Sequence, residues 1–253
     1  MPQAPQPDSY AKGMVAYGDA EAEATPTYDR WQFGLFRRFL GSKILEVGAG
    51  SGRITGLVID YGQFDELIAT EPSPHFFKLL RRRTAPNSKV KLLQSTTRDL
   101  SPTYGSHFDS VFSVHVLEHI DNDVDALREQ LDLVRPGGNL IVLVPAMQFL
   151  FSDLDRNIGH FRRYNKAMFR ALVQKVENCK LEKMFYSNAL GVLGSFYFSK
   201  VRRINYQGSE QNRRNFFRLY RWFSEYVVPW IDLIESRSPV PFGLNLTVVL
   251  RKL

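Results

Sequence analysis

The sequence predicts an α/β protein built around a mostly parallel sheet, and two observations indicate this fold. Short apolar runs typical of buried strands alternate with helical patterns between residues 43 and 144. Such alternation is expected where right-handed helical crossovers join parallel strands. The first of these runs leads into a glycine-rich turn, ILEVGAGSG (44–52). A turn of this kind lies at the carboxyl edge of an open sheet, where such folds bind their ligands.

The individual elements follow from periodicity and from their end signals. An amphipathic helix over 27–40 is expected to end at Gly41, because glycine commonly follows the last helical turn. Apolar runs predict strands at 43–47, 67–70, 89–93, 109–114 and 139–144. Helical patterns predict helices at about 53–61, 74–83, 122–134 and 166–177, the last capped by Asn165. Two further strands are expected at about 181–187 and 244–251, and RPGG (135–138) is expected to turn the chain.

Length and composition limit the class of protein. The chain has 253 residues, of which 44% are hydrophobic, enough for one α/β domain with an elaboration. Cys179 is the sole cysteine, so no intrachain disulfide can form and a reducing compartment is expected. The first residues lack the layout of a signal peptide, and no apolar run reaches the roughly 18 residues that span a bilayer. A soluble, cytoplasmic protein is therefore expected.

The net charge is +7, and a cluster of cations falls in one late segment. Its cations are Lys200, Arg202, Arg203, Arg213, Arg214, Arg218 and Arg221. They lie in a block, 189–242, whose aromatic residues recur at helical intervals. One interpretation is a helical lid that packs its aromatics on the sheet domain. Another is an interfacial helix at an anionic membrane or a lipid-linked substrate. Nucleic-acid binding is the least favoured, because no motif that reads RNA or DNA accompanies the charge.

The spacing of the glycine turn decides between ligands. A dinucleotide turn reads G-x-G-x-x-G, but Arg53 or Thr55 stands where the third glycine belongs. This argues against a nicotinamide oxidoreductase. The turn instead reads E-x-G-x-G-x-G, with Glu46 two residues before the first glycine. It resembles the first motif of class I S-adenosylmethionine (SAM)-dependent methyltransferases.

The resemblance covers about residues 41–150. FDSVFSVHVLEHI (108–120) resembles the fourth-strand motif of small-molecule methyltransferases, including quinone-biosynthesis types, and RPGG continues the pattern. It implies a doubly wound, mostly parallel seven-stranded sheet of the Rossmann-like methyltransferase fold, with an antiparallel last strand and a helical, aromatic-rich insertion before it. The expected organisation is a tail and cap helix (1–40), a SAM-binding core (41–188), a helical lid (189–242) and the final strand (243–253).

The resemblance also implies cofactor contacts. Glu46 would lie near the methionine amino group, and the turn would pass along the ligand through Gly48, Ala49, Gly50 and Gly52. Glu71, followed by Pro72, ends the second strand and would bind the ribose hydroxyls; the alternative is a role at the start of the next helix. The adenine end departs from the family pattern, since Thr96 and Thr97 stand where an acid is usual and Asp99 follows. His115 would line the methionine end.

The acceptor side is expected around Glu118 and His119 and the segment LFSDLDRNIGHFRRYNKAMF (150–169). GHFRRY (159–164) resembles a segment of bacterial methyltransferases of glycan and cell-surface pathways. The candidate substrate-binding residues are Glu118, Arg162, Arg163 and Tyr164, with Asp155 and His160 beside them. Two structural alternatives remain open. Glu118 and His119 could simply hold their loop, and Asp153 or Asp155 could pair with Arg162 or Arg163.

A metal site is considered and not expected. His115, Glu118, His119 and His160 partly match the His/Glu magnesium sites of some methyltransferases, but those begin with a carboxylate where this chain has His115. Magnesium prefers oxygen ligands, so several imidazoles would suit a transition metal better.

The function expected from the sequence is methyl transfer from SAM by in-line displacement, to oxygen in the first instance. His119, His160 and His115 are the candidate bases, since histidine titrates near neutral pH. The expected acceptor is a small molecule, a glycan or a lipid-linked compound, with peripheral membrane contact through 189–242 and nucleic acid disfavoured. The alternatives are a non-catalytic binding or scaffold module of the same fold and a nucleic-acid methyltransferase. The sequence does not set the oligomeric state.

Overall fold

The structure is a computed structural model that describes residues 25–84, 87–197 and 210–253. Its centre is a seven-stranded sheet in the order β3-β2-β1-β4-β5-β7-β6. β7 is antiparallel to both of its neighbours, and the other neighbouring strands run parallel. The strands are β1 (Lys43–Val47), β2 (Glu66–Thr70), β3 (Val90–Leu93), β4 (Phe108–Val114), β5 (Val134–Pro145), β6 (Cys179–Ser187) and β7 (Asn245–Lys252). The predicted fold class is confirmed, including the antiparallel last strand.

Helices cover both faces of this sheet because its strands bury alternate residues on opposite sides. Ile44 of β1 packs in a cluster with side chains of α2 (Pro26–Phe36) and α3 (Arg53–Tyr61). The next residue, Leu45, packs in a second cluster with side chains of α6 (Asp123–Leu133) and α8 (Lys166–Val173). Each fully buried aliphatic side chain contributes about 1.5–3 kcal/mol. The two clusters make the sheet doubly wound.

Three local features differ from the sequence prediction. The helix α5 (Thr97–Tyr104) was not predicted, although Thr96 and Asp99 form the capping box that marks its start. Pro102 inside it weakens the helical pattern. A second short helix, α7 (Asp153–Asn157), has the same kind of cap. The RPGG segment belongs to β5 and does not form a separate turn before it.

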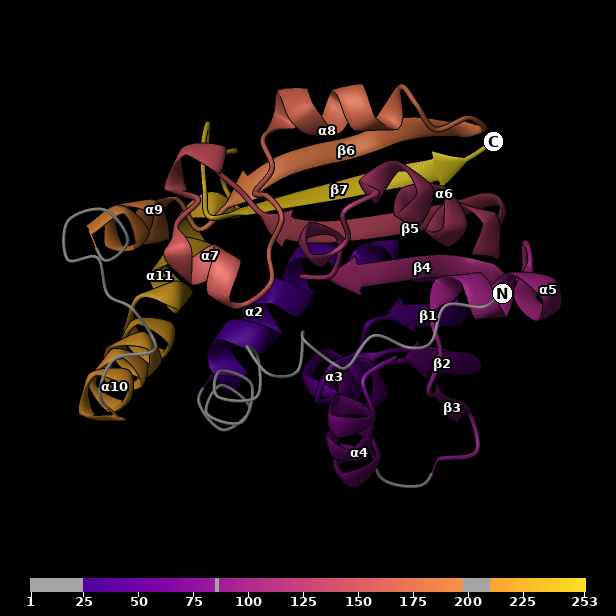
Figure 1. The fold of residues 1–253 in the computed structure, drawn as a ribbon, viewed down its shortest axis with the longest axis horizontal. Coiled ribbons are helices and arrows are strands. Elements are labelled where there is room, and N and C mark those ends of the chain that lie inside the picture. Colours follow the sequence, from indigo (N-terminus) through magenta and orange to yellow (C-terminus); the bar gives the residue numbers. More distant parts are fainter. Residues whose placement is uncertain (1–24, 85–86, 198–209) are drawn as a thin grey trace.

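The segment between β6 and β7 forms three helices in its described part: α9 (Ala189–Phe196), α10 (Glu210–Tyr226) and α11 (Val228–Glu235). Tyr28 and Trp31 of α2 pack against Val228 and Ile231 of α11. The Glu235 carboxylate accepts hydrogen bonds from the first backbone N–H groups of α9, at 2.9 and 2.8 Å. These contacts hold the helices against α2, on the side of the sheet where the parallel strands end (Figure 1).

Some residues named in the sequence predictions lie outside the part of the chain that the structure describes. The tail over residues 1–24 and the cations Lys200, Arg202 and Arg203 are not among the described residues, nor are the side chains of Arg213 and Arg214. Within the described residues, no helix is both long and apolar enough to cross a membrane.

Candidate active site

The glycine turn between β1 and α3 adopts a backbone that other residues avoid. Gly48, Gly50 and Gly52 have φ angles of +66°, +56° and +83°, in the left-handed region that costs other residues about 1–2 kcal/mol. A Cβ atom on Gly48 would lie 2.6 Å from Val116 Cγ2. At Gly50 a Cβ would meet nothing within 4 Å. Gly50 therefore faces open space, where a ligand can approach the main chain.

Glu71 lies directly beside this turn, at the end of β2. One carboxylate oxygen accepts a hydrogen bond from the Gly50 backbone N–H at 2.8 Å, and the other accepts one from Ser73 N, also at 2.8 Å. Glu71 thus has the helix-start role that the sequence left as an alternative. A carboxylate offers about four lone-pair sites, so these two hydrogen bonds do not prevent a ribose hydroxyl from binding to it as well. The two interpretations are compatible.

Glu46 is buried at the end of β1, and the Thr55 hydroxyl donates to it at 2.6 Å. Burial raises the pKa of Glu46 to about 8; the Thr55 hydrogen bond opposes this rise and the Glu71 charge adds to it. The free protein therefore holds Glu46 largely protonated at neutral pH.

This protonation predicts pH-dependent cofactor binding. The folded pKa lies above the unfolded value near 4.5, so the stability that Glu46 contributes is complete below pH about 4.5 and is lost as pH rises through about 8. An ammonium group beside Glu46 would favour the ionised form. We expect SAM affinity to rise between pH about 6 and 8, by at most about tenfold per unit, with release of a proton. Calorimetry in two buffers of different ionisation enthalpy measures that release, and Glu46→Gln should remove this contribution. Equal proton release by both proteins would disprove the role of Glu46.

At the predicted adenine end, the three candidate residues take part in hydrogen bonds around the start of α5. The Asp99 carboxylate accepts from Thr96 N and Thr96 Oγ1 at 2.9 and 2.8 Å, and Thr97 donates to Glu129 at 3.0 Å. These bonds give all three residues structural roles at the start of α5. Sequence reasoning missed Ser95, whose hydroxyl is buried without a hydrogen-bond partner among the described residues. Its position just before the Thr96 cap makes it an additional candidate.

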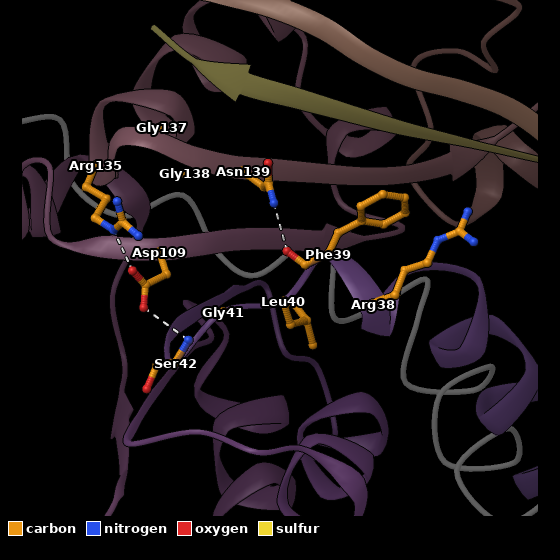
Figure 2. A pocket seen from close by; sticks show the side chains of 10 residues that line it. All are labelled: Arg38, Phe39, Leu40, Gly41, Ser42, Asp109, Arg135, Gly137, Gly138 and Asn139. Atoms are coloured by element: carbon orange, nitrogen blue, oxygen red, sulfur yellow. Dashed lines mark hydrogen bonds and ion pairs between the residues drawn. The ribbon is translucent and has the colours of Figure 1, made fainter.

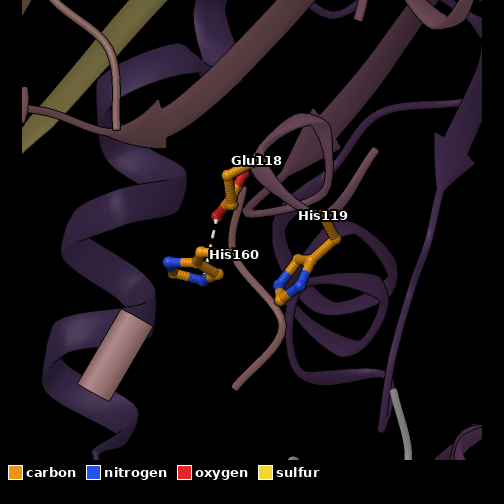
Figure 3. A group of neighbouring side chains, drawn as sticks. All are labelled: Glu118, His119 and His160. Carbon is orange, nitrogen blue, oxygen red and sulfur yellow. Dashed lines mark ion pairs between the residues drawn. The ribbon is translucent and has the colours of Figure 1, made fainter. Parts of the chain in front are cut away.

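The predicted acceptor residues gather at the end of β4. His115 follows the strand with a φ of +56°, an uncommon conformation that tends to occur at functional sites. Its Nδ1 lies 3.3 Å from Glu118 Oε1, and His160 Nε2 lies 3.9 Å from the same oxygen. The rings of His119 and His160 meet edge to face, with centroids 4.5 Å apart. Figure 3 shows the side chains of Glu118, His119 and His160 converging from two separate segments.

Burial controls the charges in this cluster. It lowers the pKa of His119 to about 4, although the nearby Glu118 charge opposes the shift. His119 is therefore neutral at pH 7 and a weak base. Burial disfavours an ionised Glu118, but the neighbouring imidazoles, His115 foremost, outweigh it and lower the pKa of Glu118. The pKa of Asp155 falls to about 2 because His160 and Arg163 outweigh the effect of its burial.

The predicted substrate contacts in GHFRRY are largely tied into the structure. Arg163 pairs with Asp155 at 2.7 Å, and Arg162 pairs with Asp123 at 2.6 Å. The Tyr164 hydroxyl donates to Asp123 at 3.1 Å, and the residue is 1% exposed. This burial gives Tyr164 a structural role in the core, and its role as a substrate contact stays a prediction. The ion pairs match the structural alternative in which carboxylates pin the arginines.

The helix α2 links the two ends of the site, which the sequence did not indicate. Its Asp29 pairs with Arg53 beside the glycine turn at 3.3 Å. One turn later, the Gln32 side-chain nitrogen lies 2.9 Å from His115 Nε2. The sequence shows that Asp29 and Gln32 share one face of a helix. It does not show that Arg53 and His115 lie beside them, because the tertiary structure determines those contacts.

A separate cavity of about 300 Å³ opens at the opposite edge of the sheet, near the amino ends of β1, β4 and β5. Asp109 in this cavity accepts from Ser42 N and Lys43 N at 3.0 and 2.8 Å and pairs with Arg135 (Figure 2). Asn139 donates to the Phe39 carbonyl at 3.0 Å. These bonds tie the end of the first helix to the sheet, so the cavity wall has a structural role.

The sheet order, the glycine turn and the carboxylates beside it define an α/β protein of methyltransferase topology. Residues 45–142 match the family model described as a methyltransferase domain. The chain thus carries a methyltransferase domain of the class I SAM-dependent type, whose cofactor is SAM.

Several solved structures share the fold. A methyltransferase of Haloferax volcanii, solved in complex with the Trm112 methyltransferase activator, matches 98% of this chain and 99% of its own, with a TM-score of 0.64 and 16% identity. Phosphoethanolamine N-methyltransferase 2 of Haemonchus contortus, solved with SAM, matches 87% of this chain and 51% of its own, with a TM-score of 0.56 and 13% identity.

Curated relatives are similar in sequence. The tRNA U34 carboxymethyltransferase of Saccharophagus degradans is 26% identical over 74% of this chain and 54% of its own length. That of Hahella chejuensis is 34% identical over 46% of this chain and 37% of its own. The chain thus spans about half, or less, of the curated relatives it matches.

These relatives correct the expectation about partners. The sequence favoured a small-molecule, glycan or lipid-linked acceptor, with membrane contact through 189–242, and disfavoured nucleic acid. That expectation is wrong, because the curated relatives are named for modifying tRNA. The basic charge of the chain was the sequence signal for such a partner, and it is present without a motif that reads nucleic acid.

Proposed function

We propose that this chain transfers a methyl group from SAM to a tRNA. The observation that carries the proposal is its similarity to tRNA U34 carboxymethyltransferases, at 26–34% identity over parts of the chain. The net charge of +7 supports a polyanionic acceptor, because phosphate neutralisation supplies much of the affinity of nucleic-acid-binding proteins.

The surface near the site is compatible with unpaired nucleotides. On α10, Trp222 and Tyr226 are 54% and 61% exposed, and their ring centroids lie 6.2 Å apart. Trp230 on α11 is 64% exposed. Arg218 and Arg221 lie exposed on the same helix as the first two rings. Exposed aromatic rings with nearby arginines are the usual platform on which single-stranded bases stack.

We assign plain SAM as the donor, because structural neighbours of this fold are solved with SAM or its demethylated product. Among the described residues around the site, Arg53, Arg162 and Arg163 are each already paired with an aspartate, so a carboxylated donor would have to compete with those aspartates for these arginines.

The transfer is an in-line displacement. A nucleophilic atom of the acceptor bonds to the methyl carbon while the carbon–sulfur bond breaks, and its electron pair neutralises the sulfonium. An acceptor hydroxyl or N–H also loses its proton. Glu46, Glu71 and the glycine turn are proposed to hold the donor, with His115, His119, His160 and Glu118 at the acceptor end. Alignment of the reacting atoms in a water-poor site provides most of the acceleration.

The test is methyl labelling with the full chain. Radiolabelled SAM is offered with bulk tRNA, and with DNA, protein and lipid in parallel, and the digested tRNA is analysed by mass spectrometry of its nucleosides. We expect label in a tRNA nucleoside. Glu71→Gln should reduce this labelling, whereas Glu66→Gln, at the opposite end of the same strand, should leave it unchanged. Label that enters only another fraction would disprove the tRNA acceptor, and incorporation only from a carboxylated donor would disprove methyl transfer.

A further inference from the structure

The acceptor end of the site contains three ligand-type side chains in one place. One atom each of Glu118, His119 and His160 can be chosen so that all three lie within 4.8 Å of one another. Ligands about 2.1 Å from a zinc ion would lie about 3.4 Å apart in a tetrahedron. Metal binding would therefore bring the ligand atoms closer together by up to about 1.4 Å.

Each imidazole is held in the orientation that a metal ligand needs. His160 Nδ1 lies 3.0 Å from Asp155 Oδ1, and His119 Nδ1 lies 3.3 Å from the Gly159 carbonyl oxygen. Both partners are acceptors, so in the neutral form of each ring the proton lies on Nδ1 and Nε2 has the lone pair. Metal-binding histidines almost always donate their other N–H to a carboxylate or a carbonyl in this way.

The surroundings of Glu118 are a second, independent indication of a metal ion. Its side chain is completely buried; the nearest donor to Oε1 is His115 Nδ1 at 3.3 Å, and Oε2 has no hydrogen-bond partner among the described residues. The 3.9 Å to His160 Nε2 is too long for a hydrogen bond, and a lone pair on that nitrogen would face a carboxylate oxygen. A buried carboxylate normally pairs with a charge or binds a metal. A cation between Glu118 and the two imidazoles would satisfy it.

The neighbouring contacts support the same arrangement. The amide nitrogen of Gln32 lies 2.9 Å from His115 Nε2, and because an amide N–H₂ group can only donate, it leaves the proton of His115 on Nδ1. That nitrogen lies 3.3 Å from Glu118 Oε1. His115 thus orients the carboxylate from outside the cluster, as Asp155 orients His160. Such outer contacts fix the direction of metal ligands.

We propose that Glu118, His119 and His160 bind one divalent transition-metal ion, with zinc the best match, at the acceptor end of the site. Two imidazoles and one carboxylate suit zinc and its neighbours and not magnesium. Three protein ligands leave a coordination position open, where an acceptor oxygen or nitrogen can bind. The sequence favoured no metal because ligand spacing along the chain does not show that His160 folds back onto Glu118.

The metal site changes the role of the histidines. Coordinated ring nitrogens cannot also remove a proton, so His119 and His160 position the acceptor through the ion and do not act as bases. The ion would instead make the acceptor proton more acidic. This inference concerns metal binding alone and does not depend on whether the acceptor is tRNA.

Cobalt titration of the full, untagged chain tests the site. Protein stripped with a chelator is titrated with Co²⁺, whose visible absorption bands report the geometry of bound nitrogen and oxygen ligands, and with Zn²⁺ by calorimetry. We expect one ion per chain. His160→Ala and Glu118→Gln should weaken binding by at least 100-fold, and Asp155→Asn should weaken it by about 10–100-fold. The control is His107→Ala, since His107 also pairs with a carboxylate, Glu66, but elsewhere on the sheet.

SAM binding shows whether each variant is folded, and the metal-site variants should retain it. If His160→Ala does not fold, Asp155→Asn tests the site instead, because it keeps the size of the side chain. Binding of Zn²⁺ with equal affinity by His107→Ala and Asp155→Asn would overturn the proposal. A lack of stoichiometric Co²⁺ binding by protein that still binds SAM would overturn it too. Metal binding without tRNA methylation would leave this site established and contradict only the proposed function.

Discussion

Glu71→Ala is expected to weaken SAM binding by at least tenfold and to destabilise the turn that holds the cofactor. The carboxylate is proposed to accept two ribose hydroxyls, and a hydrogen bond to a charged group contributes about 1.5–3 kcal/mol. A loss of only 1.4 kcal/mol already gives the tenfold change. The same substitution removes the acceptor of the Gly50 and Ser73 backbone N–H groups. We expect an additional loss of about 1–3 kcal/mol in the free energy of unfolding if those groups stay buried.

Calorimetry with SAM and urea denaturation measure the two effects separately. Glu71→Gln keeps the shape of the side chain, so it should lose affinity with a smaller loss of stability. Glu66→Ala removes a carboxylate from the other end of β2 and should leave SAM affinity unchanged. An unaltered dissociation constant in Glu71→Ala would remove the ribose assignment, whatever the stability change.

Trp31→Ala is expected to lower the free energy of unfolding by about 3 kcal/mol. Trp31 is 7% exposed and packs with Tyr28, Val228 and Ile231, the contacts that join α2 to α11. Loss of a buried tryptophan costs about 3–5 kcal/mol. The lower end applies because the Trp31 indole N–H is buried without a hydrogen-bond partner among the described residues. Removing that donor offsets part of the lost packing.

Trp230→Ala is the matched control. Trp230 lies on α11 itself but is 64% exposed, so its loss should change stability by no more than about 0.5 kcal/mol. Urea denaturation followed by circular dichroism compares the variants without relying on tryptophan fluorescence. Similar stabilities for Trp31→Ala and Trp230→Ala would show that the α2–α11 contact does not support the fold.

The role of α2 connects these experiments with the site. The helix packs on α11 through Trp31, pairs with Arg53 beside the cofactor turn, and reaches His115 through Gln32. Loosening of α2 would therefore disturb both ends of the site. We expect Trp31→Ala to weaken SAM binding as well, although less than Glu71→Ala, because its contacts with the turn are indirect.

The sequence by itself determined the sheet and the cofactor turn. Strand and helix periods depend on residues close together in the chain, and the three glycines of the turn meet a conformational demand that is also local. The positions of Glu46 and Glu71 follow from the ends of two strands, because parallel strands in such a sheet end at one edge. The helix α5 was not predicted, because Pro102 interrupts its helical pattern even though Thr96 is a clear N-cap.

Only the tertiary structure decided the acceptor end. Arg162, Arg163 and Tyr164 have the composition of a binding loop, yet ion pairs and burial tie them into the core. Glu118 and His160 are far apart in the sequence and meet because the loop after β5 folds back over the end of β4. Burial and pairing depend on neighbours that come from other segments, and residue type and spacing along one chain do not contain that information.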